Sequence, residues 1–431
     1  MKISNSSLLA HFQSATGVCT DTRKIQKGNM FFALKGPNFN ANALAEEALA
    51  KGASCAVIDD PAFDMGSKTL LVEDGLRALQ DLATAYRNTL TIPIIGLTGS
   101  NGKTTTKELI FSVLSQQFHC FATSGNLNNH IGVPLSILSI LPVHEIAVIE
   151  MGANKQGDIK ELVDIAQPTH SLITNIGKAH LEGFGGEAGV IKGKGELFDY
   201  VSAHGGIVFL PKEKNIVHQM SAERQITEVV LANVAMPTNL IEAKPYIRFS
   251  CADETVVQSH LPGIYNFENI QMAIAVGKHF GLSDAQCKEG IATYQPTNHR
   301  SQYIKIGSNQ VLMDAYNANP SSMQAAISHF AETENEPKIL ILGDMFELGD
   351  LSAAEHEALG KLIASFSFEK VLLIGEHMQQ ALTHLPKAFY FPDKFGLHNW
   401  LQDNPIKSSY LLVKGSRGIQ LESVLPFLAN D

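Results

Sequence analysis

Apolar runs of strand length alternate with helix-length segments from about residue 93 to the end of the chain. The runs occupy residues 92–100, 146–152, 170–176, 205–211, 311–316, 338–344, 370–376 and 409–416. Continuous Val, Ile and Leu runs separated in this way are typical of parallel strands that helices cover on both faces, so the pattern predicts an α/β fold. Pro296 and the polar residues of 294–302 interrupt the pattern and divide it into two successive α/β units.

A smaller mixed segment precedes residue 90. The run MFFALKG (30–36) predicts a strand, and NALAEEALAKGA (42–53) predicts an amphipathic helix that ends at Gly52. The chain contains no internal repeat and no low-complexity tract. We therefore predict three domains, namely a small mixed α/β domain over 1–90, a central parallel-sheet domain over 91–296 and a C-terminal α/β domain over 297–431.

Composition and charge exclude several classes of protein. With 45% hydrophobic and 18% charged residues the chain is neither disordered nor membrane-like, and no apolar run approaches the length of a membrane span. The N-terminus lacks the apolar core of a signal peptide, so we expect a cytoplasmic protein without membrane insertion. A net charge of -10 disfavours a nucleic-acid surface, and the five scattered cysteines indicate reduced thiols.

A glycine-containing loop follows the strand predicted over 91–100. The segment 103–117 predicts the next helix, with Leu109, Ile110, Val113 and Leu114 on one face. A loop in this position offers free N–H groups and a helix dipole to an anion; Lys103 could reach terminal phosphates and the Thr104 hydroxyl could hold Mg²⁺. The usual early glycine of such loops is replaced by Leu97. The alternative is that Gly99 and Gly102 only make a tight turn.

Three further polar residues lie close to predicted strand ends or helix starts. Glu150 ends the second apolar run, His180 lies beyond the third, and Lys194 lies near the start of a helix. Each alone has an ordinary alternative, a cap for Glu150, a structural role for His180 and a solvated charge for Lys194. Because open α/β sheets bind ligands at the carboxyl ends of their strands, we expect Lys103, Glu150 and His180 to share one crevice.

The chain resembles the Mur ligases, ATP-dependent amide-forming enzymes of peptidoglycan synthesis, in many short motifs in the same order. They are TGSNGKTT, GNLNNHIGVPLS, EMGAN, NIGKAHLEGFG, KGKGELF, GIYNFENIQMAIAV, NHRSQ, DAYNANPSSM, GDMFELG and VKGSRG. Leu97 is ordinary for this family. The resemblance implies a UDP-binding N-terminal domain, a central P-loop ATPase-like sheet and a Rossmann-like C-terminal domain.

The resemblance also implies a reaction. ATP would phosphorylate the carboxylate of a UDP-N-acetylmuramoyl-tripeptide, and the amine of D-alanyl-D-alanine would attack the acyl phosphate. The segments YNANPSSM, GNLNN and GDMFELG resemble the member of the family that adds this dipeptide. We expect a monomer.

Residue roles follow from the matched positions. Lys103, Glu150, His180, Lys194 and Arg300 match catalytic residues. Thr104 and Glu150 would bind one Mg²⁺, and His180 with a carbamylated Lys194 a second one. The ATP-binding set would be Thr98, Gly99, Ser100, Asn101, Gly102, Lys103, Thr104, Thr105, Asn266, Asn269, Arg300 and Asp314. Among these, the two asparagines match adenine contacts, with a helix cap as the alternative for Asn266, and Asp314 matches a ribose contact.

Substrate contacts are expected in two places. Thr22 and Arg23, in a segment similar to the UDP-binding domain, would bind the sugar nucleotide, the arginine as a fork on the pyrophosphate. Asn128 and Asn129 would contact the muramyl peptide, unless they only shape a turn. The dipeptide would lie near Asn317, Asn319 and Ser416. The family's Asp-Gly-His is replaced by residues 40–42, Asn-Ala-Asn.

Competing hypotheses remain for the lysine and for the whole chain. Lys194 could simply pair with Glu196, and Lys192 could take its place as the carbamylated residue. The chain could be the Mur ligase that adds the third residue or a folylpolyglutamate synthase. The segments YNANPSSM, GNLNN and GDMFELG argue against the first, and the N-terminal Asp-Thr-Arg segment argues against the second. A non-catalytic nucleotide-binding homologue is the third alternative. His180 and Lys194, which match the ligands of a second cation, argue against it, because a binding module would not need them.

Overall fold

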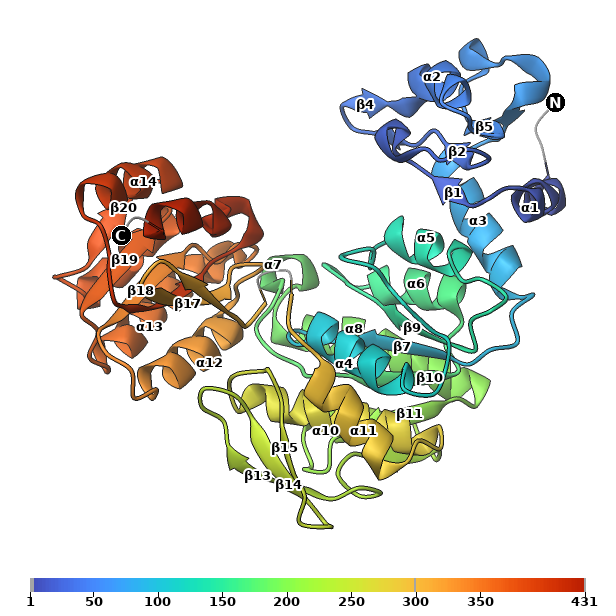
Figure 1. Ribbon diagram of the computed structural model, residues 1–431. Helices are drawn as coiled ribbons and strands as arrows, with labels where there is room; N and C mark the ends of the chain where they lie inside the picture. The colour runs from blue at the N-terminus through green and yellow to red at the C-terminus, as the bar shows by residue number, and fades with distance from the viewer. Residues whose placement is uncertain (1–3, 298–299, 430–431) are drawn as a thin grey trace.

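The computed structural model describes residues 4–297 and 300–429, which form three α/β units in chain order (Figure 1). Each unit has its own mostly parallel sheet, which confirms the predicted fold class. Within the described ranges, no helix has both the length and the apolar composition that crossing a bilayer requires. All five cysteines are free thiols.

The first unit contains a parallel sheet of order β1-β2-β5-β6, flanked by α1 (Asn5–Ser14). Its strands are β1 (Val18–Cys19), β2 (Met30–Phe32), β5 (Cys55–Ile58) and β6 (Thr69–Leu71). The strand predicted over 30–36 is shorter than expected. It ends as β2 at Phe32, because Lys35–Gly36 (β3) leaves the sheet and pairs with β4 (Phe39–Asn40). The predicted helix is present as the 3₁₀ turn Ala41–Leu44 followed by α2 (Ala45–Ala50).

The second unit contains a parallel sheet of order β12-β11-β10-β7-β9-β8. Its strands are β7 (Ile94–Thr98), β8 (Cys120–Ala122), β9 (Ile146–Glu150), β10 (His170–Ile173), β11 (Ile207–Leu210) and β12 (Val229–Leu231). Successive residues of a strand face opposite sides, so Ile94 and Ile149 enter one apolar layer while Ile95 and Val148 enter the other. Both faces are therefore apolar, which explains the continuous runs in the sequence.

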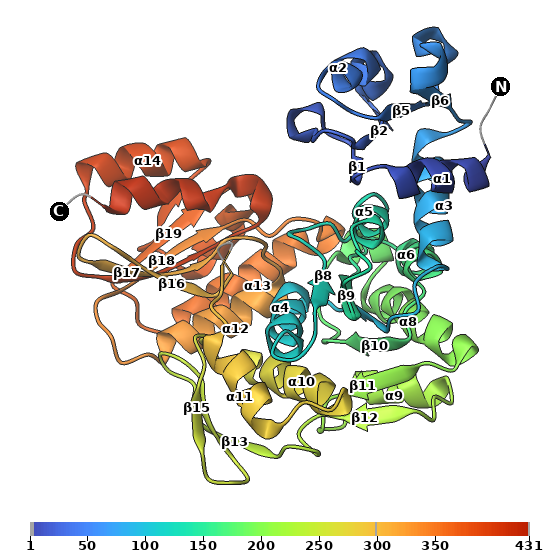
Figure 2. The ribbon, with the colours of Figure 1, turned by 45° about the vertical axis from the view of Figure 1, so that its right-hand side comes forward.

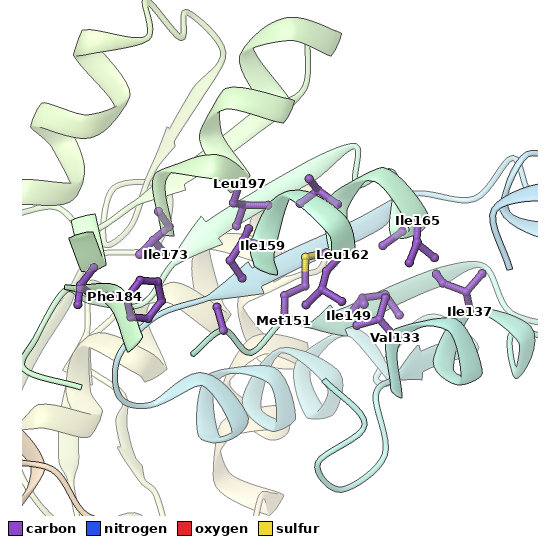
Figure 3. Packing of buried hydrophobic residues seen from close by; sticks show 14 of the residues in the cluster. Val133, Ile137, Ile149, Met151, Ile159, Leu162, Ile165, Ile173, Phe184 and Leu197 are labelled. Carbon is purple, nitrogen blue, oxygen red and sulfur yellow. The ribbon is translucent and has the colours of Figure 1, made fainter. Parts of the chain in front are cut away.

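Helices cover both faces of this sheet. One face carries α5 (Gly132–Leu138), α6 (Asp158–Ala166) and α8 (Glu187–His204), and the other carries α4 (Lys103–Leu114), α10 (Tyr265–His279) and α11 (Asp284–Thr293). Figure 3 shows the first layer, where Ile149 and Ile173 of the sheet pack with Val133, Leu162 and Leu197 of the three helices. On the other face the predicted apolar side of α4 is fully buried, at Leu109, Ile110, Val113 and Leu114.

Helix α3 (Gly75–Arg87) joins the first unit to the second (Figure 1). At its end the buried Arg87 guanidinium donates to the carbonyl oxygens of Leu90, Ala166 and Gln167, each at 2.9 Å. Ala166 and Gln167 lie at the end of α6, so these bonds fix the connecting helix to the second unit.

The apolar-run pattern misses several parts of the second unit. These are the sheet strands β8 and β12, the helix α9 (Ile216–Glu223) and an antiparallel sheet of β13 (Thr238–Glu242), β14 (Arg248–Cys251) and β15 (Val256–Gln258). The strands are short and half exposed, so they leave no continuous apolar run in the sequence.

The third unit contains a sheet of order β16-β17-β21-β18-β19-β20, parallel except for the edge strand β16. Its strands are β16 (Gln302–Ile306), β17 (Asn309–Asp314), β18 (Lys338–Gly343), β19 (Lys370–Ile374), β20 (Phe389–Phe391) and β21 (Tyr410–Lys414). Its helices are α12 (Pro320–Ala331), α13 (Ser352–Ala364) and α14 (Lys394–Asp403). Figure 2 shows this unit next to the second one, and a hydrogen bond from Asn319 to Asn101 joins the two.

Candidate active site

A cavity of about 840 Å³ lies between the second and third units. Most predicted site residues line it: Ser100, Asn101, Gly102, Lys103, Thr104, Thr105, Asn128, Asn129, Glu150, His180, Asn266, Asn269, Arg300, Asp314, Asn317, Asn319 and Ser416. Asn298 and His299, from the NHRSQ motif, lie outside the described residues. The predicted crevice at the strand ends is thus present, and the third unit closes its other side.

The glycine loop connects β7 to α4 in the conformation of an anion-binding loop. Gly99 has φ +153°, and a Cβ added there would lie 1.9 Å from Thr174 Oγ1, so the close contact requires glycine. Gly102, with φ +77°, precedes the first residue of α4. The Asn101 N–H donates to Asn175 Oδ1 at 3.0 Å, which braces the loop. Thr98 is fully buried behind the loop, and the helix N-terminus faces the cavity.

The Lys103 ammonium lies over this loop. Nζ donates to the carbonyl oxygen of Gly99 at 2.8 Å and has a longer contact to that of Ser100 at 3.5 Å. Burial lowers the pKa of Lys103; the positive charge of Arg300 lowers it further, whereas Glu150 opposes the shift. Since both bonded partners are neutral carbonyls, the ammonium can turn to an anion without leaving a carboxylate unpaired.

Glu150 ends β9 and is almost completely buried. Its Oε1 accepts hydrogen bonds from Thr104 Oγ1 at 3.2 Å and from Asn128 Nδ2 at 2.8 Å. Among the described residues, Oε2 accepts no hydrogen bond, and the buried Lys107 ammonium lies 3.9 Å from it. A buried carboxylate oxygen without a hydrogen bond, next to a threonine hydroxyl, fits a divalent cation.

No group of three or more His, Cys, Asp or Glu side chains within the described residues could hold a metal ion. The site fits Mg²⁺ in a different way, because this ion usually takes one or two carboxylates together with waters and phosphate oxygens. Thr104 and Glu150 supply protein oxygens at the mouth of the phosphate loop. The phosphates of a nucleotide would complete the coordination.

His180 follows β10 and precedes α7 (Leu181–Phe184). Its backbone is left-handed, with φ +53°, which is uncommon for a residue with a side chain. Its Nδ1 contacts Oε2 of Glu347 from the third unit. This contact with His180 lowers the pKa of Glu347, although burial opposes the shift.

Lys194 has no exposed surface, on the inner side of α8. Its ammonium lies 5.4 Å from the centre of the Phe184 ring, and burial, together with the charge of Lys103, lowers the pKa of Lys194 well below its usual range. The alternative pairing with Glu196 is wrong, because that carboxylate accepts the N–H groups at Gly157 and Lys160, at 2.7 and 2.8 Å.

The sequence offers two candidates for the carbamylated lysine, Lys192 and Lys194, and their environments in the structure differ. Lys192 is exposed whereas Lys194 is buried. Residues two apart on a helix point in nearly opposite directions, so only one of them can face the interior. A buried ammonium for which the described residues provide no carboxylate partner is the one with reason to change its chemical state.

Asn266 and Asn269 lie in the first turns of α10 and are buried. Asn266 Nδ2 donates to the Pro262 carbonyl oxygen at 2.8 Å, and Asn269 Nδ2 donates to Asn266 Oδ1 at 2.9 Å. The N-cap position is Ile264, so the cap alternative for Asn266 is wrong. A Cβ added to Gly102 would lie 3.1 Å from the Asn269 amide, so this amide adjoins the phosphate loop.

Arg300 and Asp314 lie on the side of the cavity formed by the third unit. The Arg300 guanidinium stacks on the Tyr316 ring, 3.6 Å from its centre. Asp314 accepts the Ser301 N–H at 3.1 Å and the buried Lys414 ammonium at 2.5 Å. The charge of Asp314 is therefore balanced, while among the described residues the buried Nε of Arg300 has no hydrogen-bond partner.

The predicted substrate asparagines differ in how much of their hydrogen-bonding capacity is used. Asn129 Oδ1 accepts the N–H groups of Ile131 and Gly132 at 3.1 and 2.8 Å, so it shapes the start of α5. Asn319 caps α12 and donates to Asn101 Oδ1 at 2.7 Å. Asn317 is exposed to the cavity.

Ser416 is buried beside the third-unit loops. Its Oγ accepts the Phe346 N–H at 3.0 Å, and its contact with the Ala318 carbonyl is 3.5 Å. It therefore holds two loops together at the edge of the cavity.

Thr22 and Arg23 lie in the first unit, outside the residues that line the cavity. Arg23 is exposed and forms a fork with Asp21, at 2.9 and 2.8 Å, and these hydrogen bonds lower the pKa of Asp21. Thr22 is buried, and its carbonyl oxygen accepts from Lys51 Nζ at 3.2 Å.

Residues 40–42 have a structural role in the first unit. Asn42 is fully buried and exchanges two hydrogen bonds with Asp59, at 2.8 and 3.0 Å. Asn40 Oδ1 accepts the Asn42 N–H at 3.0 Å. The departure from the family motif thus provides amides that hold this loop to the end of β5.

Several residues of the cavity escaped the sequence analysis. Tyr316, Glu347 and Lys414 fall inside quoted motifs, and Asn175 begins NIGKAHLEGFG. Their positions within motifs are the only signal that the sequence offers. Their partners lie far away in the chain, so the contacts become visible only in the fold.

Comparisons with known proteins agree with this geometry. The Mur ligase middle domain matches residues 97–277, and the Mur ligase, glutamate ligase domain matches residues 299–417. The crystal structure of MurF from Acinetobacter baumannii has a TM-score of 0.87 and 29% identity, covering 100% of this chain and 99% of that one.

Two sequence relatives are named UDP-N-acetylmuramoyl-tripeptide--D-alanyl-D-alanine ligase, from Bacillus subtilis (strain 168) and Escherichia coli (strain K12). Each is 34% identical to this chain over 96% of its length, and the matches cover 93% and 94% of the relatives. Because this similarity extends through nearly the whole chain, the protein belongs to the Mur ligase family.

Proposed function

We propose that this protein joins D-alanyl-D-alanine to UDP-N-acetylmuramoyl-tripeptide, using ATP and an acyl-phosphate intermediate, and that it acts as a monomer. The observation that carries the proposal is the cavity, which combines a phosphate loop, a buried acidic strand end and a histidine with cationic groups of the third unit. Relatives with near-complete coverage carry the name of this ligase.

The first step brings two anions together, the tripeptide carboxylate and the terminal phosphate of ATP. Lys103 and the N-terminus of α4 would hold the β and γ phosphates, and Arg300 would contact the transferring phosphate. Asn266 and Asn269 would bind adenine and Asp314 the ribose. The cavity therefore supplies positive charge at the point where the two anions must approach.

Two Mg²⁺ ions are part of the proposal. Thr104 and Glu150 would hold the first, and His180 with carbamylated Lys194 the second. Bound Mg²⁺ would screen the charges of the phosphates and the carboxylate and polarise the transferring phosphate. The carbamate would arise when the uncharged Lys194 amine adds to CO₂ and releases one proton. Complete burial, with no carboxylate partner among the described residues, favours that uncharged amine.

The sugar nucleotide would span two units. Its UDP end would bind Thr22 and Arg23 in the first unit, where the exposed guanidinium could exchange Asp21 for the pyrophosphate. The muramyl peptide would then pass Asn128 and Asn129 to bring its terminal carboxylate to the phosphate loop. Of the residues predicted for the dipeptide, Asn317 has the exposed amide, whereas Asn319 and Ser416 would shape the pocket.

In the second step the dipeptide amine attacks the acyl carbon and inorganic phosphate leaves. Water in the cavity would hydrolyse the same intermediate, so the third unit must cover the site during the reaction. Its residues already line one side of the cavity.

Phosphate release tests this function. Wild-type protein should release phosphate only when ATP, UDP-N-acetylmuramoyl-tripeptide and D-alanyl-D-alanine are all present, and Lys103→Met should not. Tripeptides with diaminopimelate and with lysine should be compared side by side. Phosphate release when a single amino acid replaces D-alanyl-D-alanine would identify a different ligase. ATP binding without any phosphate release would indicate a non-catalytic homologue.

A further inference from the structure

We infer that Glu347 of the third unit is a positioning residue for His180, and that the second cation site is complete only when the second and third units meet. The inference extends the proposed function, since it rests on the cation-binding role proposed for His180. The position of Glu347 in the motif GDMFELG does not by itself assign this residue a role.

The two residues face each other in unusual backbone conformations. His180 has φ +53° and Glu347 has φ +62°, and both are left-handed although neither is glycine. Such conformations are strained for residues with a side chain and persist where the surrounding structure imposes them. The backbone also joins the segments, because the Glu182 N–H donates to the Glu347 carbonyl oxygen at 3.3 Å.

The contact selects one nitrogen of the imidazole. Glu347 Oε2 lies against Nδ1 of His180 as an ion-pair contact without hydrogen-bond geometry, and the described residues offer Nδ1 no other hydrogen-bond partner; a carboxylate in that place favours the tautomer with the proton on Nδ1. The unprotonated Nε2 is then the nitrogen with a free lone pair. Histidines that bind metals are commonly held in this way, with the other ring nitrogen donating to a carboxylate.

Glu347 comes from a different unit than the residue it orients. Its side chain remains about half exposed, with a relative accessibility of 53%, against 18% for His180. A second ion pair, Lys178 to Glu355 at 2.6 Å, joins the same two segments nearby. Separation of the units would break both contacts, so orientation of His180 depends on their approach.

Mn²⁺ titration followed by electron paramagnetic resonance, with a non-hydrolysable ATP analogue present, tests the inference. Wild-type protein should bind two ions per chain. Glu347→Ala should weaken the second site about 10- to 100-fold and leave the first unchanged. Glu347→Gln should restore most of the affinity, because its amide oxygen can also accept from Nδ1. Glu355→Gln is the matched control and should bind both ions normally.

Each of the other outcomes contradicts a defined part of the inference or of the proposed function. Wild-type affinity at both sites of Glu347→Ala would overturn the inference alone. If Glu347→Gln binds the second ion as weakly as Glu347→Ala does, the Glu347 carboxylate contacts the cation directly and does not act through His180. An equal loss in Glu355→Gln would show that any ion pair between the units suffices. A single site in the wild-type protein would remove the second cation from the proposed function, and this inference with it.

Discussion

Acid should loosen the central sheet through His170, the first residue of β10. Its Nε2 lies 3.2 Å from His279 Nε2, and its Nδ1 lies 2.8 Å from Thr169 Oγ1. The ring packs on Phe280, with centres 4.9 Å apart. Burial, together with the nearby His279, lowers the pKa of His170 from 6.5 to about 4. The folded protein therefore holds this ring neutral at a pH where the unfolded chain would protonate it.

The sign and size of the effect follow from these two values. Because the folded pKa lies below the unfolded one, the stability associated with neutral His170 is present above pH 6.5 and is lost as the pH falls through 4. Between pH 7 and pH 5 the loss is about 2 kcal/mol, and it approaches about 3 kcal/mol below pH 4.

Hydrogen exchange measured on peptides from β7 and β10 gives the opening free energy of this sheet separately from the other units. The matched control is His170→Phe, which retains an aromatic ring but cannot titrate. Between pH 7 and pH 5 the stability difference should move by about 2 kcal/mol in favour of the variant. Parallel pH curves for the two proteins would refute the reasoning.

Three further predictions concern the cavity. Gly99→Ala should abolish ATP binding in calorimetry, because the added Cβ would lie 1.9 Å from Thr174 Oγ1; retained affinity would contradict the tight loop. Ligation should depend on bicarbonate, and Lys194→Ala should lose about 10- to 100-fold activity and recover part of it with added acetate; full activity of the variant would exclude the carbamate. Asn319→Asp should keep the cap of α12 but lose the donor to Asn101, so the KM for ATP should rise about 2- to 10-fold without a fall in Tm, and an unchanged KM would make that bond irrelevant.

Most strands of the second and third parallel sheets, and the phosphate loop, were predictable because their signals are local. Each buried strand is a continuous apolar run, and the loop between β7 and α4 is a contiguous segment. The antiparallel strands β13 to β15 were not predictable in this way, since they are short and half exposed.

The residues of the candidate site also differ in whether a local sequence signal could identify them. Glu150 and His180 could be placed because they follow apolar runs, whereas the choice of Lys194 over Lys192 required the orientation of α8. Glu347 and Lys414 were invisible as site residues because their partners, His180 and Asp314, lie far away in the sequence. Contacts between units depend on how whole domains meet, and no local pattern encodes that.

The most direct test of the acyl-phosphate route uses a tripeptide substrate whose terminal carboxylate carries ¹⁸O at both oxygens. If ATP phosphorylates that carboxylate, one labelled oxygen bridges to phosphorus and leaves with the phosphate when the dipeptide amine attacks. Mass spectrometry should therefore find one ¹⁸O in each released phosphate, together with the extended peptide. Product formation with unlabelled phosphate would contradict the mechanism, and absence of the extended peptide would contradict the proposed function.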